Sequence, residues 1–190
     1  IFMYSKIKEL SNRDGLSGLY NRRYLNLYYD EHFIKNTIDG TAIAALLDID
    51  HFKKINDTYG HLFGDQAIIM VSDIINKIAA QNDGITFRYG GEEFVVALID
   101  TSEAGLKETA ERIRLAIEKA SFDIKQKLPL KVTVSIGAYL KRPDGRYSMA
   151  ESLKFADSAL YKAKEGGRNQ VVEYLETEPE KGVILEEAHQ

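Results

Sequence analysis

The chain has 190 residues, of which 44% are hydrophobic, and its formal net charge is −4. This length fits one domain with short extensions, and the composition allows an ordinary buried core and excludes a disordered chain. The negative charge argues against a nucleic-acid partner, because surfaces that bind DNA or RNA are usually basic. The chain has no cysteine, which excludes disulfides, thiolate nucleophiles and cysteine-bound zinc.

The first segment, residues 1–12, has the pattern of a helix end, with Met3, Ile7 and Leu10 at heptad-like spacing. One heptad is too short to establish a coiled coil, so a simple helical lead-in fits equally well. The chain starts at Ile1 rather than at Met, and it has no apolar run near the roughly 18 residues of a membrane span. We therefore expect a fragment of a longer protein, whose targeting signals this chain does not reveal.

A loop rich in glycine and polar residues follows at Asp14–Arg23. Asn21 is predicted to cap a helix that runs to about residue 36, because an asparagine side chain can accept from the free amides of the first turn. Tyr24, Leu27 and Tyr28 are expected to face inward from this helix.

The next strand is predicted over Thr41–Asp50. Its apolar run, residues 42–47, is typical of a strand covered on both faces. The alternation of side chains along a strand places Asp48 and Asp50 on the same side of its end. This Asp-x-Asp pair is compatible with a metal ligand or with the N-cap of a following helix.

Polar side chains suited to a nucleotide follow this strand. Lys53 could contact a phosphate, and Asn56 and Asp65 carry the groups needed to read a guanine edge. A carboxylate accepts from guanine N1–H and the 2-amino group, and an amide can pair with the remaining edge. Taken singly, each residue has a simpler explanation, as a surface lysine, a turn residue and the N-cap of an amphipathic helix that opens at Asp65. Their combination favours the nucleotide interpretation.

A β-hairpin is predicted where Ile85–Tyr89 and Phe94–Ile99 flank a Gly-Gly pair. Glycine adopts the positive φ of a tight turn without a Cβ clash, so the turn should present Glu92 and Glu93 at its tip. Adjacent carboxylates repel, and pairing with a cation or metal relieves this repulsion. A solvated hairpin end is the alternative explanation.

The elements expected after the hairpin are a helix from Asp100–Ser102, a strand over Lys131–Ala138, a turn at Pro143–Gly145, a helix with the capping box Ser148 and Glu151, and a last strand over Gln170–Tyr174. The second helix ends in a lysine-rich turn followed by Gly166, which is a common helix stop.

Four motifs in this order resemble the GGDEF domain family, the catalytic module of diguanylate cyclases. They are Asp14–Arg23 (with Ser17 where the family has Thr), His51–Asp65, Gly90–Phe94 in the Glu form of the signature, and Tyr161–Asn169. The likeness covers roughly residues 12–175. It implies a helical linker from an upstream sensor domain over 1–12, a catalytic domain over 13–175 and an acidic tail over 176–190.

Alternating strands and helices around one hairpin predict an α/β (α+β) fold with a mixed sheet and helices packed over it. The resemblance implies more: a mainly antiparallel central sheet flanked by helices, in the palm-like, ferredoxin-related fold of nucleotidyl cyclases. In that fold the end of the Asp48 strand lies beside the Gly90–Gly91 tip.

The resemblance implies a diguanylate cyclase that condenses two GTP into cyclic di-GMP and pyrophosphate, within a homodimer of facing domains. The implied catalytic residues are Asp48, Glu92 and Glu93; the metal ligands are Asp48, the Ile49 carbonyl and Glu92; the substrate-binding residues are Phe52, Lys53, Asn56, Asp65, Lys164 and Arg168. The expected cofactor is Mg²⁺, with Mn²⁺ as the alternative. The implied location is cytoplasmic, either free or as the cytoplasmic domain of a membrane-anchored sensor.

One stretch departs from the family. Many members carry R-x-x-D before the hairpin as an inhibitory product site, and here Gln81–Gly84 lacks both residues. We therefore expect no inhibitory product site at this position.

Two other functions stay open: a catalytically silent GTP-binding or interaction module, and a cyclase that makes a mixed purine dinucleotide. Retention of Asp65 favours guanine over adenine. A class III adenylyl-cyclase-like enzyme would share the palm fold but lacks this motif set.

Overall fold

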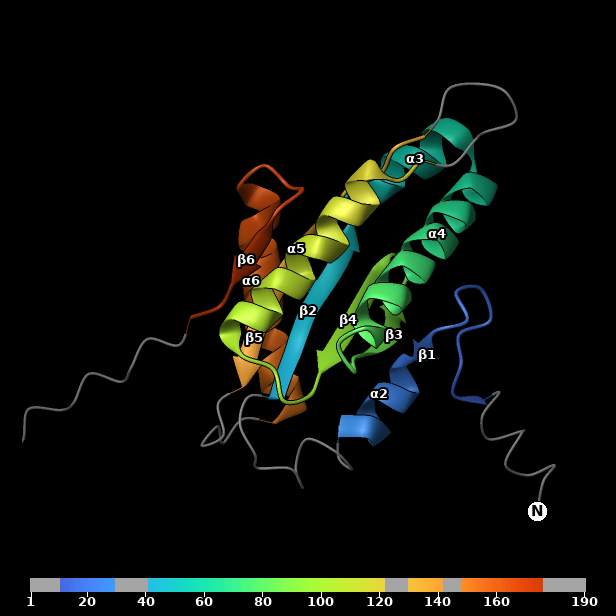
Figure 1. The fold of residues 1–190 in the computed structure, drawn as a ribbon. Helices are drawn as coiled ribbons and strands as arrows, with labels where there is room; N and C mark the ends of the chain where they lie inside the picture. The colour runs from blue at the N-terminus through green and yellow to red at the C-terminus, as the bar shows by residue number, and fades with distance from the viewer. Residues whose placement is uncertain (1–10, 30–40, 122–129, 142–147, 176–190) are drawn as a thin grey trace, which may run out of the picture.

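The structure is a computed structural model that describes residues 11–29, 41–121, 130–141 and 148–175, with the backbone alone described at 41–45. The elements are, in chain order, β1 (Tyr20–Asn21), α2 (Arg22–Tyr28), β2 (Thr41–Ile49), α3 (Phe52–Tyr59), α4 (His61–Ala80), β3 (Ile85–Gly90), β4 (Glu93–Leu98), α5 (Glu103–Lys119), β5 (Val134–Lys141), α6 (Met149–Glu165) and β6 (Val171–Glu173) (Figure 1).

The strands form one six-stranded sheet in the order β1-β3-β4-β2-β5-β6. The pairs β3–β4, β4–β2 and β2–β5 are antiparallel, and the edge strands β1 and β6 pair in parallel. This confirms the predicted mixed, mainly antiparallel sheet flanked by helices. The apolar strand β2 lies in the middle of the sheet, as a strand buried on both faces must.

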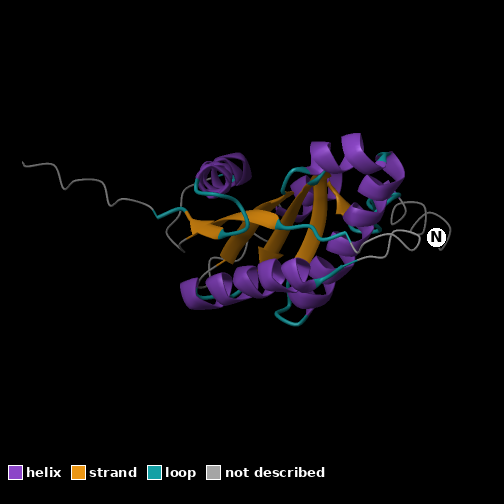
Figure 2. Ribbon diagram, turned by 90° about the horizontal axis from the view of Figure 1, so that it is seen from above, coloured by secondary structure: helices purple, strands orange, loops and turns teal. Residues whose placement is uncertain are grey.

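Helices cover both faces of the sheet (Figure 2). Side chains alternate along β2, so Leu47 and Ile49 pack in a core with α3, α4 and α5, whereas Leu46 packs in a second core with α2 and α6. Both cores contain fully buried aromatic residues, Phe94 in the first and Phe87 and Tyr139 in the second. The sheet is therefore the middle layer of three, and its ends are the places where loops can form a site.

The region after β2 differs from the prediction. A separate helix, α3, precedes α4, and α4 begins at His61 rather than at Asp65. Gly60, with φ of +90°, leaves the helical conformation and separates the two helices, so α4 starts immediately after it. Asp65 consequently lies inside α4, and the N-cap interpretation of Asp65 is wrong.

Smaller differences concern bounds and faces. The strand predicted over Lys131–Ala138 is β5, Val134–Lys141, because its register is set by pairing with β2. In α2, Leu27 is 43% exposed and Leu25 is buried instead, so the predicted inward position of Leu27 is wrong. The predicted cap is confirmed, since the Asn21 side chain accepts from the Tyr24 amide.

Several predictions lie outside the described residues. They are the lead-in helix over 1–10, the extension of the Asn21-capped helix to residue 36, the turn at Pro143–Gly145 and the acidic tail. The capping box of α6 is described and confirmed, with Ser148 and Glu151 each bonding the backbone of the other.

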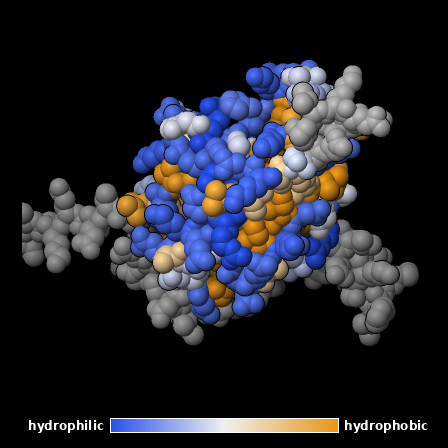
Figure 3. Space-filling view, turned by 45° about the horizontal axis from the view of Figure 1, so that its top comes forward, coloured by the Kyte–Doolittle hydropathy of each residue, from blue (hydrophilic) through white to orange (hydrophobic). Residues whose placement is uncertain are grey.

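Polar side chains cover most of the surface in the view of Figure 3, and apolar areas lie between them. Among the described residues, no helix is both long enough and apolar enough to cross a membrane.

The contact between α6 and β5 gives a test of this packing. A methyl group at Gly137 would meet the Ala156 carbonyl and the Leu160 backbone of α6, and backbone atoms cannot move aside. Gly137→Ala should lower the free energy of unfolding by about 1–3 kcal/mol, measured by urea denaturation. The matched control is Gly15→Ala, where a Cβ meets nothing within 4 Å and where stability should change by less than about 1 kcal/mol. Equal effects of the two substitutions would contradict this packing.

Candidate active site

The acidic hairpin is the centre of the site. Gly90 pairs with Glu93, so Gly91 and Glu92 form a two-residue turn, and Gly91 takes the positive φ of +45°. The Arg88 guanidinium donates to the Gly91 carbonyl from Nε at 3.0 Å and from Nη2 at 2.8 Å. These bonds hold the turn from its own strand, and they fix the backbone on which Glu92 and Glu93 stand.

The same arginine ties the turn to the Asp14–Arg23 loop. Arg88 Nη1 lies 2.9 Å from Asp14 Oδ1, which also accepts from the Ser17 amide and hydroxyl. Burial raises the pKa of Asp14, but the hydrogen bonds from Ser17 and Arg88 outweigh burial and lower this pKa on balance. The loop thus acts as a support for the hairpin. The sequence analysis assigned no role to Arg88, although its place just before the Gly-Gly pair was a signal.

Asp48 and Glu93 face each other across the sheet, since β2 and β4 pair them in register. Their strand neighbours Leu47 and Phe94 point into the core on the α4–α5 side, so both carboxylates point to the α6 side. There Lys164, in the last turn of α6, places its ammonium 2.8 Å from Asp48 Oδ2. Three residues that are distant in the chain therefore meet at one end of the sheet.

Burial controls the charge of both carboxylates. Burial raises the pKa of Asp48, the ion pair with Lys164 lowers it in part, and the Glu92 and Asp50 charges add to the rise. The pKa of Glu93 is also raised, first by burial and then by the Asp48 charge. Each carboxylate thus favours a nearby cation or proton.

The residues that the resemblance assigns to metal binding lie together. The Ile49 amide donates to the Glu92 carbonyl at 3.3 Å, so the hairpin turn runs beside the end of β2 that carries Asp48. Among the described residues, no three His, Asp or Glu side chains gather closely enough to bind a metal by themselves. One or two carboxylates and a backbone carbonyl nevertheless fit Mg²⁺, which usually takes its other ligands from substrate phosphates and water.

The residues predicted to read a base lie on α3 and α4. The Asn56 side-chain oxygen is buried and has no hydrogen-bond partner in the described part of the chain. It lies against Gly64, where a methyl group would collide with it and would stand 3.1 Å from Phe52 Cζ. Asp65, one residue further along α4, is partly exposed. The missing side chain of Gly64 makes room for this oxygen, and an unpaired buried acceptor gains from a ligand that supplies a donor.

The predicted phosphate contacts lie at the same end of the sheet. Lys53 is exposed on the first turn of α3, a few residues beyond Asp48. Arg168 is exposed on the turn between α6 and β6, close in the chain to Lys164. The amides around Phe52 begin α3 and have no partners within that helix.

A hollow borders this region on the α6 side of the sheet. A cavity of about 540 Å³ opens between α2 and α6, and its lining includes Glu93, Tyr89, Arg22, Lys154 and Asp157. It gives Glu93 room to meet a large ligand from the α6 side.

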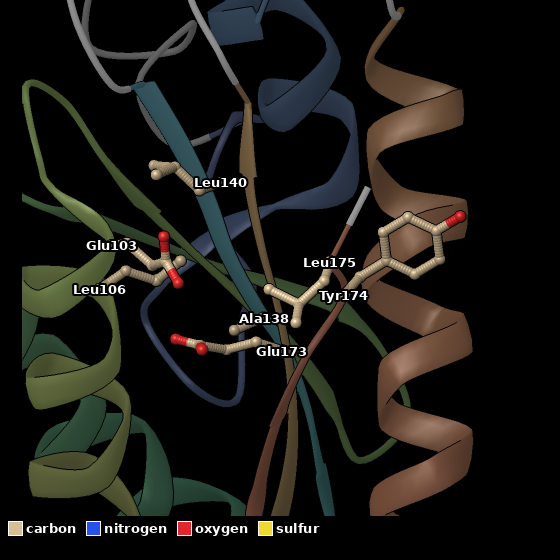
Figure 4. A pocket seen from close by; sticks show the side chains of 7 residues that line it. All are labelled: Glu103, Leu106, Ala138, Leu140, Glu173, Tyr174 and Leu175. Carbon is tan, nitrogen blue, oxygen red and sulfur yellow. The ribbon is translucent and has the colours of Figure 1, made fainter. Parts of the chain in front are cut away.

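A second hollow lies on the other face of the sheet, between α5 and β6 (Figure 4). Its carboxylates, Glu103 and Glu173, face each other, whereas the Tyr174 ring turns toward α6, where it stacks on Phe155. It contains none of the predicted site residues.

Comparison with known proteins agrees with this geometry. Residues 11–170 match the family model described as "Diguanylate cyclase, GGDEF domain". The chain is 40% identical over 168 residues to the probable diguanylate cyclase DgcT of Escherichia coli, covering 87% of this chain and 36% of DgcT. It is 42% identical over 168 residues to the response regulator PleD of Caulobacter vibrioides, covering 86% of this chain and 36% of PleD. The chain therefore spans about a third of the length of these curated relatives.

A solved structure shows the same fold. The GGDEF domain of DgcB from Caulobacter crescentus, crystallised with c-di-GMP, superimposes with a TM-score of 0.80 at 34% identity, over 87% of this chain and 94% of that one. The fold and the acidic hairpin thus define an α/β domain of the cyclase type. The chain belongs to the GGDEF domain family of diguanylate cyclases.

The raised pKa of Glu93 gives a test in metal-free protein. A carboxyl whose folded-state pKa lies above the ordinary 4.5 contributes stability that is present below pH 4.5 and is lost as the pH rises through the folded value. Glu93→Gln avoids that loss, so in EDTA it should raise the Tm at about pH 7 by about 2–4 °C, a shift that corresponds to roughly 1 kcal/mol. Scanning calorimetry at several pH values measures this.

The difference in Tm between Glu93→Gln and the parent should shrink toward about pH 4. There the Glu93 carboxyl of the parent is largely protonated and, like the amide of the variant, carries no charge. The control is Glu108→Gln, at an exposed glutamate of α5, which should change the Tm little at any pH. A difference that does not vary with pH would mean that packing, and not charge, is responsible.

Proposed function

We propose that this domain is a diguanylate cyclase, which condenses two GTP into cyclic di-GMP with release of two pyrophosphates. The observation that carries the proposal is the cross-strand pairing of Asp48 with Glu93, beside the turn of the acidic hairpin. Lys164 forms an ion pair with Asp48 at the same place. The family match and the c-di-GMP-bound structure of the DgcB domain support the same reaction.

Guanine is the base that Asn56 of α3 and Asp65 of α4 suit best. The Asp65 carboxylate accepts from N1–H and the 2-amino group of guanine, whereas adenine offers no such pair of donors. The buried Asn56 oxygen, which lies against Gly64 without a partner in the described part of the chain, would gain one from an amino group of the base. Satisfying a buried acceptor only in the complex contributes to base selection.

The cations bind the triphosphate. Lys53 and Arg168, exposed at this end of the sheet, and the amides around Phe52 hold the β- and γ-phosphates. Lys164 pairs with Asp48 in the free protein and would be free to contact a phosphate if a metal ion bound that carboxylate.

Asp48, Glu92 and the Ile49 carbonyl would hold Mg²⁺ or Mn²⁺. This ion would offset the charge that develops on the α-phosphate. Burial is the main cause of the raised pKa of Asp48, and a divalent cation on that carboxylate would favour its charged form.

Glu93 accepts the proton of the attacking 3′-hydroxyl. Its raised pKa makes it a stronger base than an ordinary glutamate, as general-base catalysis near neutral pH requires. Because each domain holds one GTP, two domains must face each other so that each hydroxyl attacks the α-phosphate held by the other. Turnover therefore requires a homodimer, and in the full-length protein an upstream sensor domain controls its assembly.

The test is mass spectrometry of products after incubation of the domain, at high concentration, with equimolar GTP and ATP and Mg²⁺. We expect cyclic di-GMP from the parent and at least a roughly 100-fold lower yield from Glu92→Ala and Glu93→Ala. Glu108→Ala, at an exposed glutamate of α5, is the matched control and should behave like the parent.

The other outcomes separate the alternatives. A mixed dinucleotide would overturn the role of Asp65 in base selection. No product from a chain with a dimerising helix added before Ile1, together with intact GTP binding, would identify a silent module. Activity per domain that stays constant on high dilution would exclude the dimer mechanism.

Product inhibition is expected to be weak. Gln81, at the position where many relatives carry the arginine of the inhibitory site, accepts from Arg112 at 2.6 Å, and Gly84 stands where they carry the aspartate. Calorimetric titration of cyclic di-GMP into the Glu92→Ala variant should show no site tighter than about 1 μM. Tight binding that survives this substitution would contradict the expectation.

A further inference from the structure

The buried carboxylate of Asp50 has no part in the reaction described above. Asp50 is 5% exposed at the end of β2, and three donors surround it. The Ser135 hydroxyl donates to Oδ1 at 2.6 Å, and the Thr133 hydroxyl and the Asn169 amide donate to Oδ2 at 2.7 and 3.0 Å. A carboxylate with three such bonds is satisfied without a metal ion. It caps no helix either, because His51 precedes α3.

The third donor belongs to an unusual turn between α6 and β6. Arg168 and Asn169 have φ of +67° and +45°, a region that residues other than glycine rarely adopt. Two such residues in succession persist only where the surroundings hold them. The Arg168 amide donates to the Ala163 carbonyl at 2.9 Å, and the Asn169 amide donates to Asp50.

The Asn169 side chain holds the turn from a second direction. Its Nδ2 donates to Glu118 at 2.8 Å, and its Oδ1 accepts from Arg114 at 2.9 Å; both partners lie on α5. The backbone of Asn169 is thus bonded to the end of the sheet, and its side chain is bonded to α5. Arg168 belongs to this anchored turn, and its side chain is exposed.

We propose that Asp50 is a positioning residue for phosphate binding: it fixes the turn at 166–170 so that Arg168 is held ready for the triphosphate. This inference rests on the proposed function. Asp48, near the end of β2, and Asp50, just after the strand, then have separate tasks. The first acts toward the metal and substrate, and the second toward the turn that carries Arg168. Since the bond to Asn169 needs an acceptor and not a charge, an amide at position 50 should perform the same task.

The test compares Asp50→Ala with Asp50→Asn. The amide can accept from Thr133 and Asn169 with its oxygen and donate to Ser135, whose hydroxyl can turn to accept. Binding is measured by calorimetry with 3′-deoxy-GTP, which cannot cyclise. Asp50→Ala should weaken binding about tenfold, and it should raise KM for GTP more than it lowers kcat. Asp50→Asn should stay within about threefold of the parent. If Asn were as damaging as Ala, the charge of Asp50 would matter, and the proposal would be overturned.

Hydrogen exchange of the turn gives a readout that does not depend on GTP. In Asp50→Ala the Asn169 amide loses its acceptor, so exchange over 166–170 should speed up about tenfold or more, whereas Asp50→Asn should leave it unchanged. Should Asp50→Ala fail to fold, Thr133→Val removes one donor, keeps the carboxylate and should produce smaller changes of the same sign. Unchanged exchange in the folded variants would contradict the anchor itself.

A double-mutant cycle links the anchor to Arg168. If Asp50 acts through Arg168, then Asp50→Ala should weaken binding of 3′-deoxy-GTP little further in the presence of Arg168→Ala. The same substitution combined with Lys53→Ala should show independent losses that multiply. Full independence from Arg168 would overturn the proposal. A parent domain that binds no nucleotide, with normal protection of the turn, would instead reject the proposed function and leave the anchor intact.

Discussion

The central constraint on this domain is the strand register that sets two carboxylates, the buried Asp48 and the half-buried Glu93, opposite each other on one face of a sheet. Like charges that face each other with little access to water repel. The ammonium of Lys164, 2.8 Å from Asp48 Oδ2, offsets this repulsion. Burial, and then the charges of nearby carboxylates, leave both carboxyl groups with raised pKa values, so each favours a proton or a cation close by.

The rest of the fold keeps these charges in place. Arg88 holds the hairpin turn through the Gly91 carbonyl and reaches Asp14 in the loop near the start of the domain. The close approach of α6 to Gly137 places the end of that helix, and with it Lys164, over the sheet. Rigid contacts of this type let a site hold unfavourable charges that a mobile loop would release to water.

Two carboxylates at the end of β2, Asp48 within the strand and Asp50 just after it, illustrate how position decides chemistry. Asp48 lies opposite a glutamate and an ammonium, whereas Asp50 lies among hydroxyl and amide donors. The first is left with a need for a cation, and the second is satisfied by neutral groups. The Asp-x-Asp pattern could not distinguish these two environments, because the partners of Asp50 come from β5 and from the turn after α6.

The sequence by itself determined what depends on neighbours in the chain. The hairpin at Gly90–Gly91, the caps at Asn21 and Ser148 and the apolar course of β2 followed from turn chemistry and periodicity, and the motifs identified the family. Only the tertiary structure decided that Asp48 meets Glu93 and Lys164, that Asp65 lies within α4 and that Asp50 holds a turn. Such contacts depend on strand register and on helix packing, which join segments far apart in the chain and leave no short-range pattern.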